Sequence, residues 1–312
     1  MGFSTADRHI IINYHYIEEP REDRRGIYPC APAEFERQLD FVSRRFRFGG
    51  VEDVFAAARS DGRTPVAALT FDDCLRSQFE NAVPILIRRG IPATFFPITS
   101  TFAGLLPPAH KIHFLRSSFS GEELVKLFNT FLATLDGARD VSTWRIPLDR
   151  RLPGQERPHK AEDVPTANFK EMLLAVPEEV KEIFFRSVFA KLGVNEEQVR
   201  REFFMSPLEV CELSRRGFTI GNHSHTHLSY RNDDQMFLSQ DLAMAGRLLE
   251  ELVGVRPNVF SYPHGRYNHA MVASLKAQGF RYAVTIENRA VGPTDAPFAI
   301  PRLDTNALKP YA

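Results

Sequence analysis

The stretch VAALTFDDCLRSQFENAVPIL, residues 66–86, decides the fold, because an apolar strand-like run ends there at two adjacent carboxylates, Asp72 and Asp73, and an amphipathic run follows. One Asp before a helix is expected as a cap for its free N–H groups. A second carboxylate beside it at the mouth of a core makes ionisation of both more costly. A metal ion bound by one of the two would remove that cost, so the pair predicts a metal site whose other ligands lie elsewhere in the chain.

The composition is that of an ordinary globular protein. The 312 residues suffice for one large α/β domain or two smaller ones. Lys and Arg number 39, as do Asp and Glu, so the net charge indicates neither nucleic-acid binding nor an acidic membrane surface. The three cysteines are too scattered for a disulfide framework or a cysteine zinc site.

The N-terminal segment, MGFSTADRHIIINYHYIEEP, has neither the basic start nor the apolar run of a secretory signal. No apolar run in the chain approaches the length of a membrane span. We therefore expect a cytoplasmic protein without a transmembrane segment.

Apolar β-rich runs alternate with amphipathic runs along most of the chain. Strands are expected at 8–16, 65–71, 91–99, 217–223, 258–263, 280–287 and 298–303, and helices at 31–46, 77–90, 233–254 and 268–279. This alternation predicts an α/β fold with a parallel sheet and crossover helices, either open or closed into a barrel.

Residues 104–205 interrupt the alternation with a polar stretch between helical patterns at 121–135 and 178–193. We interpret them as a largely helical insertion on a strand-to-helix loop of a single domain, 1–312. Active sites of parallel α/β proteins lie at the carboxyl ends of strands. The insertion is therefore expected to form a lid or a substrate wall.

The stretch GFTIGNHSHTHLSY, residues 217–230, supplies the expected remaining ligands. His223 and His227 are four residues apart, so on a helical turn they would share one face. Two imidazoles and one carboxylate with an open position form a catalytic metal arrangement. A single His after a strand is usually structural, but three within five positions favour a metal site, with His225 in a supporting role.

Three motifs occur in order after predicted strands: TFDD at 70–73, HSHTH at 223–227 and YPHGRYN at 262–268. Together they resemble the NodB-type polysaccharide deacetylases, carbohydrate esterase family 4. NYHY at 13–16 and AVPILIRRGIPATFF at 82–96 are similar to that family too. The resemblance covers nearly the whole chain except the insertion, and it implies a distorted (β/α) barrel.

The resemblance also implies roles for individual residues in metal-dependent removal of an acyl group from a sugar amine. Asp73, His223 and His227 match the metal ligands. Asp72 matches the general base that takes a proton from metal-bound water, and His264 the residue whose backbone N–H stabilises the oxyanion. One divalent ion is implied: zinc, with cobalt or nickel as alternatives.

Two positions depart from the family pattern near the base. Ser261 stands where the family has an Arg that orients the base, and we expect Arg302 to reach Asp72 in its place, with a surface or capping role as the alternative. Cys74 stands where the family commonly has Gly, and it is expected to be a buried filler because no partner base is evident.

A third departure concerns the general acid, because no His follows His269. The candidate donors are His264, His15, His110 and His113. Residues expected to contact the substrate are Tyr262, Pro263, His15, His110 and His113.

The leading function is hydrolysis of the N-acetyl group of an amino sugar or glycan precursor. Removal of a formyl group or opening of a cyclic amide at the same metal site is an alternative. A carbohydrate-binding module without catalysis is a third, and the intact set of Asp72, Asp73, His223 and His227 argues against it.

Overall fold

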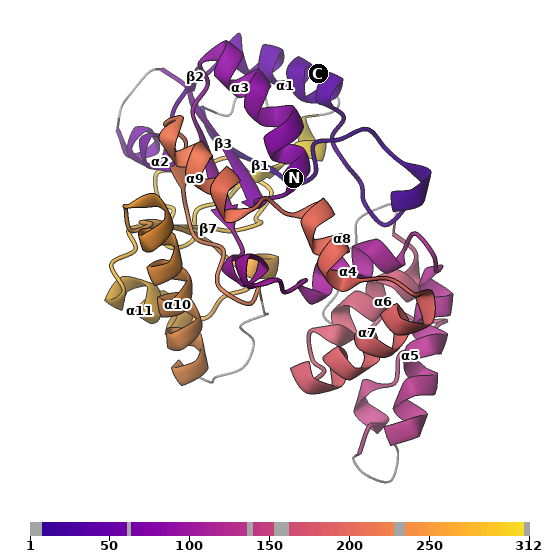
Figure 1. Cartoon of the computed structure of the whole chain (residues 1–312). Helices are drawn as coiled ribbons and strands as arrows, with labels where there is room; N and C mark the ends of the chain where they lie inside the picture. Colours follow the sequence, from indigo (N-terminus) through magenta and orange to yellow (C-terminus); the bar gives the residue numbers. More distant parts are fainter. Residues whose placement is uncertain (1–7, 61–63, 136–139, 153–161, 228–234, 309–312) are drawn as a thin grey trace. The chain divides into compact units, whose positions relative to one another are not determined.

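The computed structural model describes residues 8–60, 64–135, 140–152, 162–227 and 235–308 (Figure 1). The chain divides into two compact units. The first comprises Met1–Glu19, Pro29–Leu105 and Arg200–Ala312, and the second comprises Pro20–Tyr28 and Leu106–Val199.

All strands of the described residues belong to the first unit. They are β1 (His9–Tyr14), β2 (Arg47–Phe48), β3 (Val66–Asp73), β4 (Ala93–Pro97), β5 (Thr219–Ile220), β6 (Val259–Ser261), β7 (Tyr282–Val284) and β8 (Leu303–Asp304). One parallel sheet has the order β5-β4-β3-β1-β8, with β2 beside the start of β3, and β6 pairs with β7 in a second sheet. A single bridge joins Asn222, just after β5, to Phe260 of β6, and another joins Val284 of β7 to Ile300, three residues before β8. The strands therefore close into an irregular ring, and the predicted distorted barrel is confirmed.

The central strands position the two carboxylates. β1 and β3 are buried along their full length, as near-continuous apolar runs in parallel sheets are. In the register of β3 with β4, Asp72 lies opposite Phe96 and Asp73 opposite Pro97. Both carboxylates therefore stand at the carboxyl end of a central strand, where parallel α/β folds build their sites.

The helices of the first unit are α1 (Pro32–Ser43), α2 (Val51–Arg59), α3 (Val83–Arg89), α9 (Pro207–Arg215), α10 (Gln235–Val253) and α11 (His269–Ala277). α10 and α11 lie side by side and pack on β6 and β7 (Figure 1). The single helix predicted over 77–90 is a π-helical turn, Gln78–Ala82, followed by α3, which ends at Gly90 with φ of 61°. Of the strand expected at 298–303, only the bridge of Ile300 and the start of β8 are present.

The second unit is helical in its described residues. It contains α4 (Pro108–Leu115), α5 (Gly121–Leu135), α6 (Val164–Leu173) and α7 (Glu178–Leu192), and α8 (Glu196–Phe203) follows them in the chain. Its core is built on Phe rings, with Phe128 edge-on to Phe169 at 5.9 Å and to Phe184 at 5.1 Å. That residues 104–205 form a lid or substrate wall within one domain stays a prediction.

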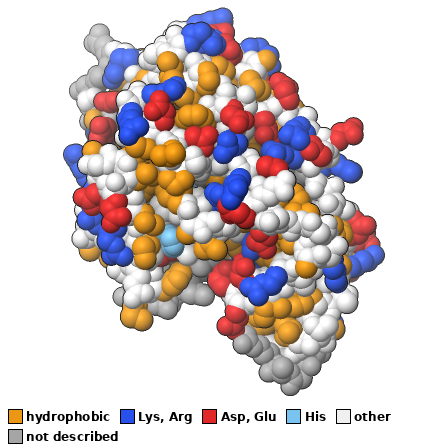
Figure 2. Space-filling view, in the orientation of Figure 1, with side chains coloured by type: hydrophobic (Ala, Val, Ile, Leu, Met, Phe, Trp, Pro, Cys, Tyr) orange, Lys and Arg blue, Asp and Glu red, His pale blue; other side chains and the backbone are white. Residues whose placement is uncertain are grey.

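The surface carries both signs of charge. Lys and Arg side chains are interspersed with Asp and Glu on the face in Figure 2. No helix among the described residues combines the length and the apolarity needed to cross a lipid bilayer.

Candidate metal centre

Asp72 and Asp73 are both buried at the end of β3, where the chain turns sharply. Asp73 and Cys74 have φ of 73° and 54°, in the left-handed region. Glycine adopts that conformation without strain, which explains why it suits the position that Cys74 occupies. Burial and the charges of Asp73 and Asp72 raise the pKa of the Cys74 thiol, so it is not an activated nucleophile.

His223 and His227 lie in the loop after β5. The helical turn expected from their spacing is wrong, because residues 221–227 are not helical. Ser224 and His227 instead have φ of 69° and 57°. These two left-handed residues kink the loop and bring the two imidazole rings to 4.8 Å from each other. The histidines thus converge through a kinked loop and not through one face of a helix.

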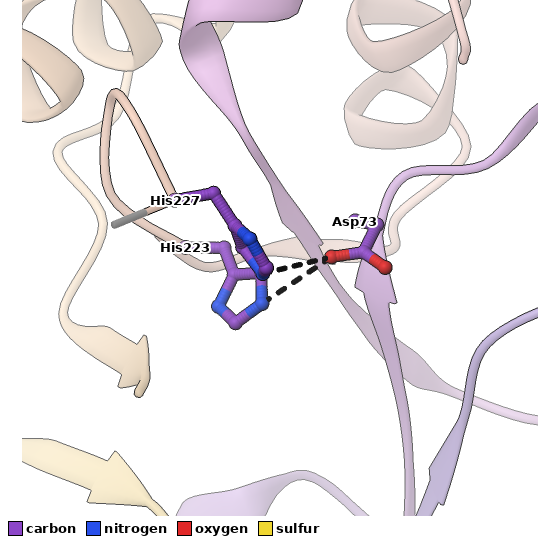
Figure 3. Close-up of side chains that lie close together, drawn as sticks. All are labelled: Asp73, His223 and His227. Carbon is purple, nitrogen blue, oxygen red and sulfur yellow. Dashed lines mark ion pairs between the residues drawn. The ribbon is translucent and has the colours of Figure 1, made fainter. Parts of the chain in front are cut away.

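Asp73 faces both imidazoles (Figure 3). Its Oδ1 is 3.4 Å from Nε2 of His223 and 3.5 Å from Nε2 of His227. Two ligand atoms about 2.1 Å from one tetrahedral ion stand about 3.4 Å apart. The three side chains are buried and their ligand atoms lie within 4.8 Å of one another. The donor set and its spacing therefore fit a single divalent ion.

A hydrogen bond to the backbone fixes the orientation of the His223 ring. Its Nδ1 is 2.7 Å from the carbonyl oxygen of Ser261, which leaves Nε2 for Asp73 and an ion. Burial favours the neutral ring, but the charges of Asp72 and Asp73 outweigh it and raise the pKa of His223. Because a ligand imidazole must be neutral, metal binding at this site competes with protons.

The contact expected between Arg302 and Asp72 is present. Arg302 Nη1 and Nη2 donate to Asp72 Oδ1 and Oδ2 at 2.9 and 2.8 Å. The guanidinium is fully buried and also donates to Ser261 Oγ at 3.0 Å and Asn13 Oδ1 at 2.9 Å. Ser261 thus accepts a hydrogen bond from an Arg that arrives from the neighbourhood of β8.

This pairing sets the charge of Asp72. Burial, the largest influence, would raise the pKa of the carboxyl, but the Arg302 guanidinium together with the charges of His223 and His15 outweighs it and brings the pKa to about 2. Asp72 is therefore ionised at neutral pH.

Two of the candidate acids lie at the site. His15, in the loop after β1, has its Nε2 3.9 Å from Asp72 Oδ2, and its side chain is 45% exposed. The His264 ring lies 4.7 Å from that of His227, and its φ is 57°. Burial, with the charges of His223 and Arg266, lowers the pKa of His264 to about 4.

The remaining candidates are placed as follows. Tyr262 is buried, donates from its hydroxyl to the Phe298 carbonyl at 3.0 Å, and stacks on Tyr267. Pro263 beside it is buried. His110 and His113 belong to the second unit, on α4, where their rings lie 5.5 Å apart.

Sequence reasoning missed Asn13 and Asp241, which hold the site in place. Asn13 accepts from Arg302, and its signal was a polar residue inside the apolar run of β1. Asp241 holds the histidine loop from α10, and no sequence motif marks it.

Known proteins are similar to this chain in sequence and in fold. The family model for polysaccharide deacetylases matches residues 59–110 and 179–283, about half of the chain. A putative polysaccharide deacetylase of Bacillus subtilis, YxkH, is 23% identical over 95 residues, a match that spans 34% of that protein's length.

Solved structures extend the likeness in fold to nearly the whole chain. A deacetylase of Streptococcus pyogenes, PplD, solved in complex with acetate, is 14% identical with a TM-score of 0.59, and the match covers 98% of both chains. IcaB from Ammonifex degensii is 18% identical with a TM-score of 0.58, covering 96% of this chain and 91% of its own. The family match, the site motifs within it and this shared fold agree, and the chain belongs to the polysaccharide deacetylase family.

Proposed function

We propose that this protein is a metal-dependent N-deacetylase that removes the acetyl group from an amino sugar of a glycan or glycan precursor. One observation carries the proposal: two adjacent carboxylates at the end of β3 have different partners. Asp73 faces His223 and His227, whereas Asp72 is paired with Arg302. Acetate, the product expected here, is bound in the S. pyogenes deacetylase of the same fold.

Asp73, His223 and His227 would hold the ion, and their nitrogen and oxygen donors suit zinc, with cobalt or nickel as alternatives. A divalent ion supplies a lowered pKa for a coordinated water and polarisation of the amide carbonyl. Because the three ligands are buried, bulk water would screen the charge of the ion only weakly.

Asp72 acts as the general base. It is ionised at neutral pH, and the two parallel hydrogen bonds from Arg302 fix the plane of its carboxylate. It takes a proton from the attacking water. The backbone N–H of His264 stabilises the negative charge that develops on the amide oxygen, a contribution of about 3 kcal/mol for one such donor.

His15 returns a proton to the leaving amine. It is the candidate whose ring nitrogen stands close to the base, 3.9 Å from Asp72 Oδ2, and its partly exposed side chain can reach a bound substrate and exchange protons with solvent.

His15→Gln is expected to lower kcat for an N-acetyl sugar by about 10²- to 10³-fold, because the poor amine leaving group loses its proton donor. An aryl acetate ester, whose phenolate leaves without protonation, is expected to lose far less rate. The measurement is kcat for both substrates, with exposed His269→Gln as control. Equal losses on the two substrates would contradict the acid role.

The proposed function is tested by acid release from a panel of N-acetyl and N-formyl sugars, free and nucleotide-linked, with zinc or cobalt added. We expect acetate from the wild type and about 10²- to 10⁴-fold slower release from Asp72→Asn. Formate without acetate would favour the deformylase alternative. Silence from a metal-loaded protein that still binds sugars would favour the non-catalytic module.

A further inference from the structure

Asp241 lies on α10 with its side chain buried against the loop that carries the two histidines. Its Oδ2 accepts the backbone N–H of His225 at 3.0 Å. Its Oδ1 accepts the backbone N–H of Thr226 at 3.0 Å and the Thr226 hydroxyl at 2.7 Å. One carboxylate therefore holds the two residues next to each other in the middle of the HSHTH stretch.

The loop needs such support because its conformation is unfavourable for the residues it contains. Ser224 and His227 are left-handed, a region that side chains other than Gly disfavour. Two local hydrogen bonds support the kinks: Ser224 N–H donates to Asn222 Oδ1 at 2.7 Å, and His227 N–H donates to Ser224 Oγ at 2.9 Å. Asp241 holds the peptide groups between them.

Backbone donors near β4 secure the other side of the loop. Thr99 N–H donates to the Ser224 carbonyl at 3.2 Å, and Ser100 N–H donates to the His225 carbonyl at 2.9 Å. The loop is thus clamped between the segment after β4 and the carboxylate of Asp241. The Thr99 hydroxyl adds a side-chain contact, 2.9 Å from Nδ1 of His225. The carboxylate of Asp241 accepts three hydrogen bonds from the loop, which a single substitution can disrupt.

We propose that Asp241 is a positioning residue for the metal centre: its carboxylate holds residues 225–226 so that His223 and His227 are already convergent when an ion arrives. The inference rests on the proposed metal site. If the two ligands are already in place, the loop loses little conformational entropy when the ion binds. Loss of the Asp241 carboxylate is therefore expected to weaken metal binding and to change the geometry of the ligands.

The chemistry requires a carboxylate at this position. The groups of His225 and Thr226 that contact Asp241 are all donors, and a charged acceptor makes stronger hydrogen bonds with them than a neutral one. Asn at 241 would turn an NH2 group toward at least one donor. Asp241→Asn keeps the size of the side chain and disrupts the clamp.

The test measures the zinc dissociation constant of the full chain by competition with a chromophoric chelator. Asp241→Asn is expected to weaken zinc binding by about 10- to 100-fold, the range for residues that orient metal ligands. The visible spectrum of the cobalt-loaded variant is expected to shift, because the two imidazoles no longer hold one geometry. Asp295→Asn is the matched control, since Asp295 is also buried and accepts a backbone N–H, from Gly292 at 2.8 Å. It is expected to bind zinc as the wild type does.

Thr226→Val decides the matter if Asp241→Asn does not fold. It removes only the 2.7 Å hydrogen bond to Asp241 and is expected to weaken zinc binding in the same direction by a smaller factor. Wild-type affinity and an unchanged cobalt spectrum in the folded Asp241 variant, or in Thr226→Val alone, would overturn the role of Asp241 and leave the metal centre standing. A wild-type chain that takes up neither zinc nor cobalt would overturn both.

Discussion

Asp72→Asn is expected to lower kcat for acetate release by about 10²- to 10⁴-fold, the usual contribution of a general base. The amide cannot accept the proton of the attacking water. It is not among the three groups that face one another as metal ligands, so zinc content is expected to stay at the wild-type level. The measurement combines kcat with the zinc content of the purified variant.

The same substitution leaves the buried guanidinium of Arg302 without its counter-charge. Removing one partner of a buried ion pair costs about 3–5 kcal/mol of unfolding free energy, so a lower Tm is expected as well. Asp40→Asn is the control, because Asp40 pairs with Arg89 at the surface and outside the site. A folded, zinc-loaded Asp72 variant with kcat within tenfold of the wild type would remove Asp72 from the mechanism.

The central strands were predictable because their apolar runs are long and local. β1 and β4 lie within the ranges expected from sequence, and β3 begins within its expected range but continues two residues beyond it, to Asp73. The segment 77–90 was predicted as one regular helix, but it begins with a π-helical turn. Gln78, in its π-helical turn, donates to the carbonyl oxygens of His15 and Asp72 at 2.9 and 2.7 Å. These are tertiary contacts, and a pattern based on local periodicity carries no information about them.

The site was predictable to the extent that its residues sit in short motifs. The resemblance pointed to Asp73, His223 and His227, whereas the physical reason first offered for the two histidines, one face of a helix, does not hold. Arg302 was predictable because Ser261 replaces the Arg that the family places beside Asp72, and a buried carboxylate needs a cation to pair with. Asp241 was not, because a side chain that accepts hydrogen bonds from the backbone and a hydroxyl of a loop distant in sequence has no fixed spacing to these partners.

Arg302→Met is expected to raise the pKa of Asp72 and to shift the acid limb of the kcat/KM profile to higher pH. In the native protein the pKa of Asp72 is about 2, below its ordinary value of 3.8. Its depressed pKa stabilises the fold above pH 3.8, and this stabilisation is lost as pH falls through about 2. Without the guanidinium burial remains the largest influence and raises the pKa of Asp72, opposed only by the charges of His223 and His15.

In the variant a smaller fraction of Asp72 is therefore expected to be ionised at acidic pH. At neutral pH the variant is expected to lose about 3–5 kcal/mol of unfolding free energy, because a charged carboxylate is left buried without its Arg partner. Kinetics across pH and chemical unfolding at neutral pH measure the two effects. Arg302→Lys keeps the charge but not the paired hydrogen bonds, so it should fall between wild type and Met. Arg289→Met, which breaks a half-exposed pair with Asp295, should leave the profile in place. An acid limb that does not move in Arg302→Met would mean that Arg302 stabilises the barrel without setting the charge of the base.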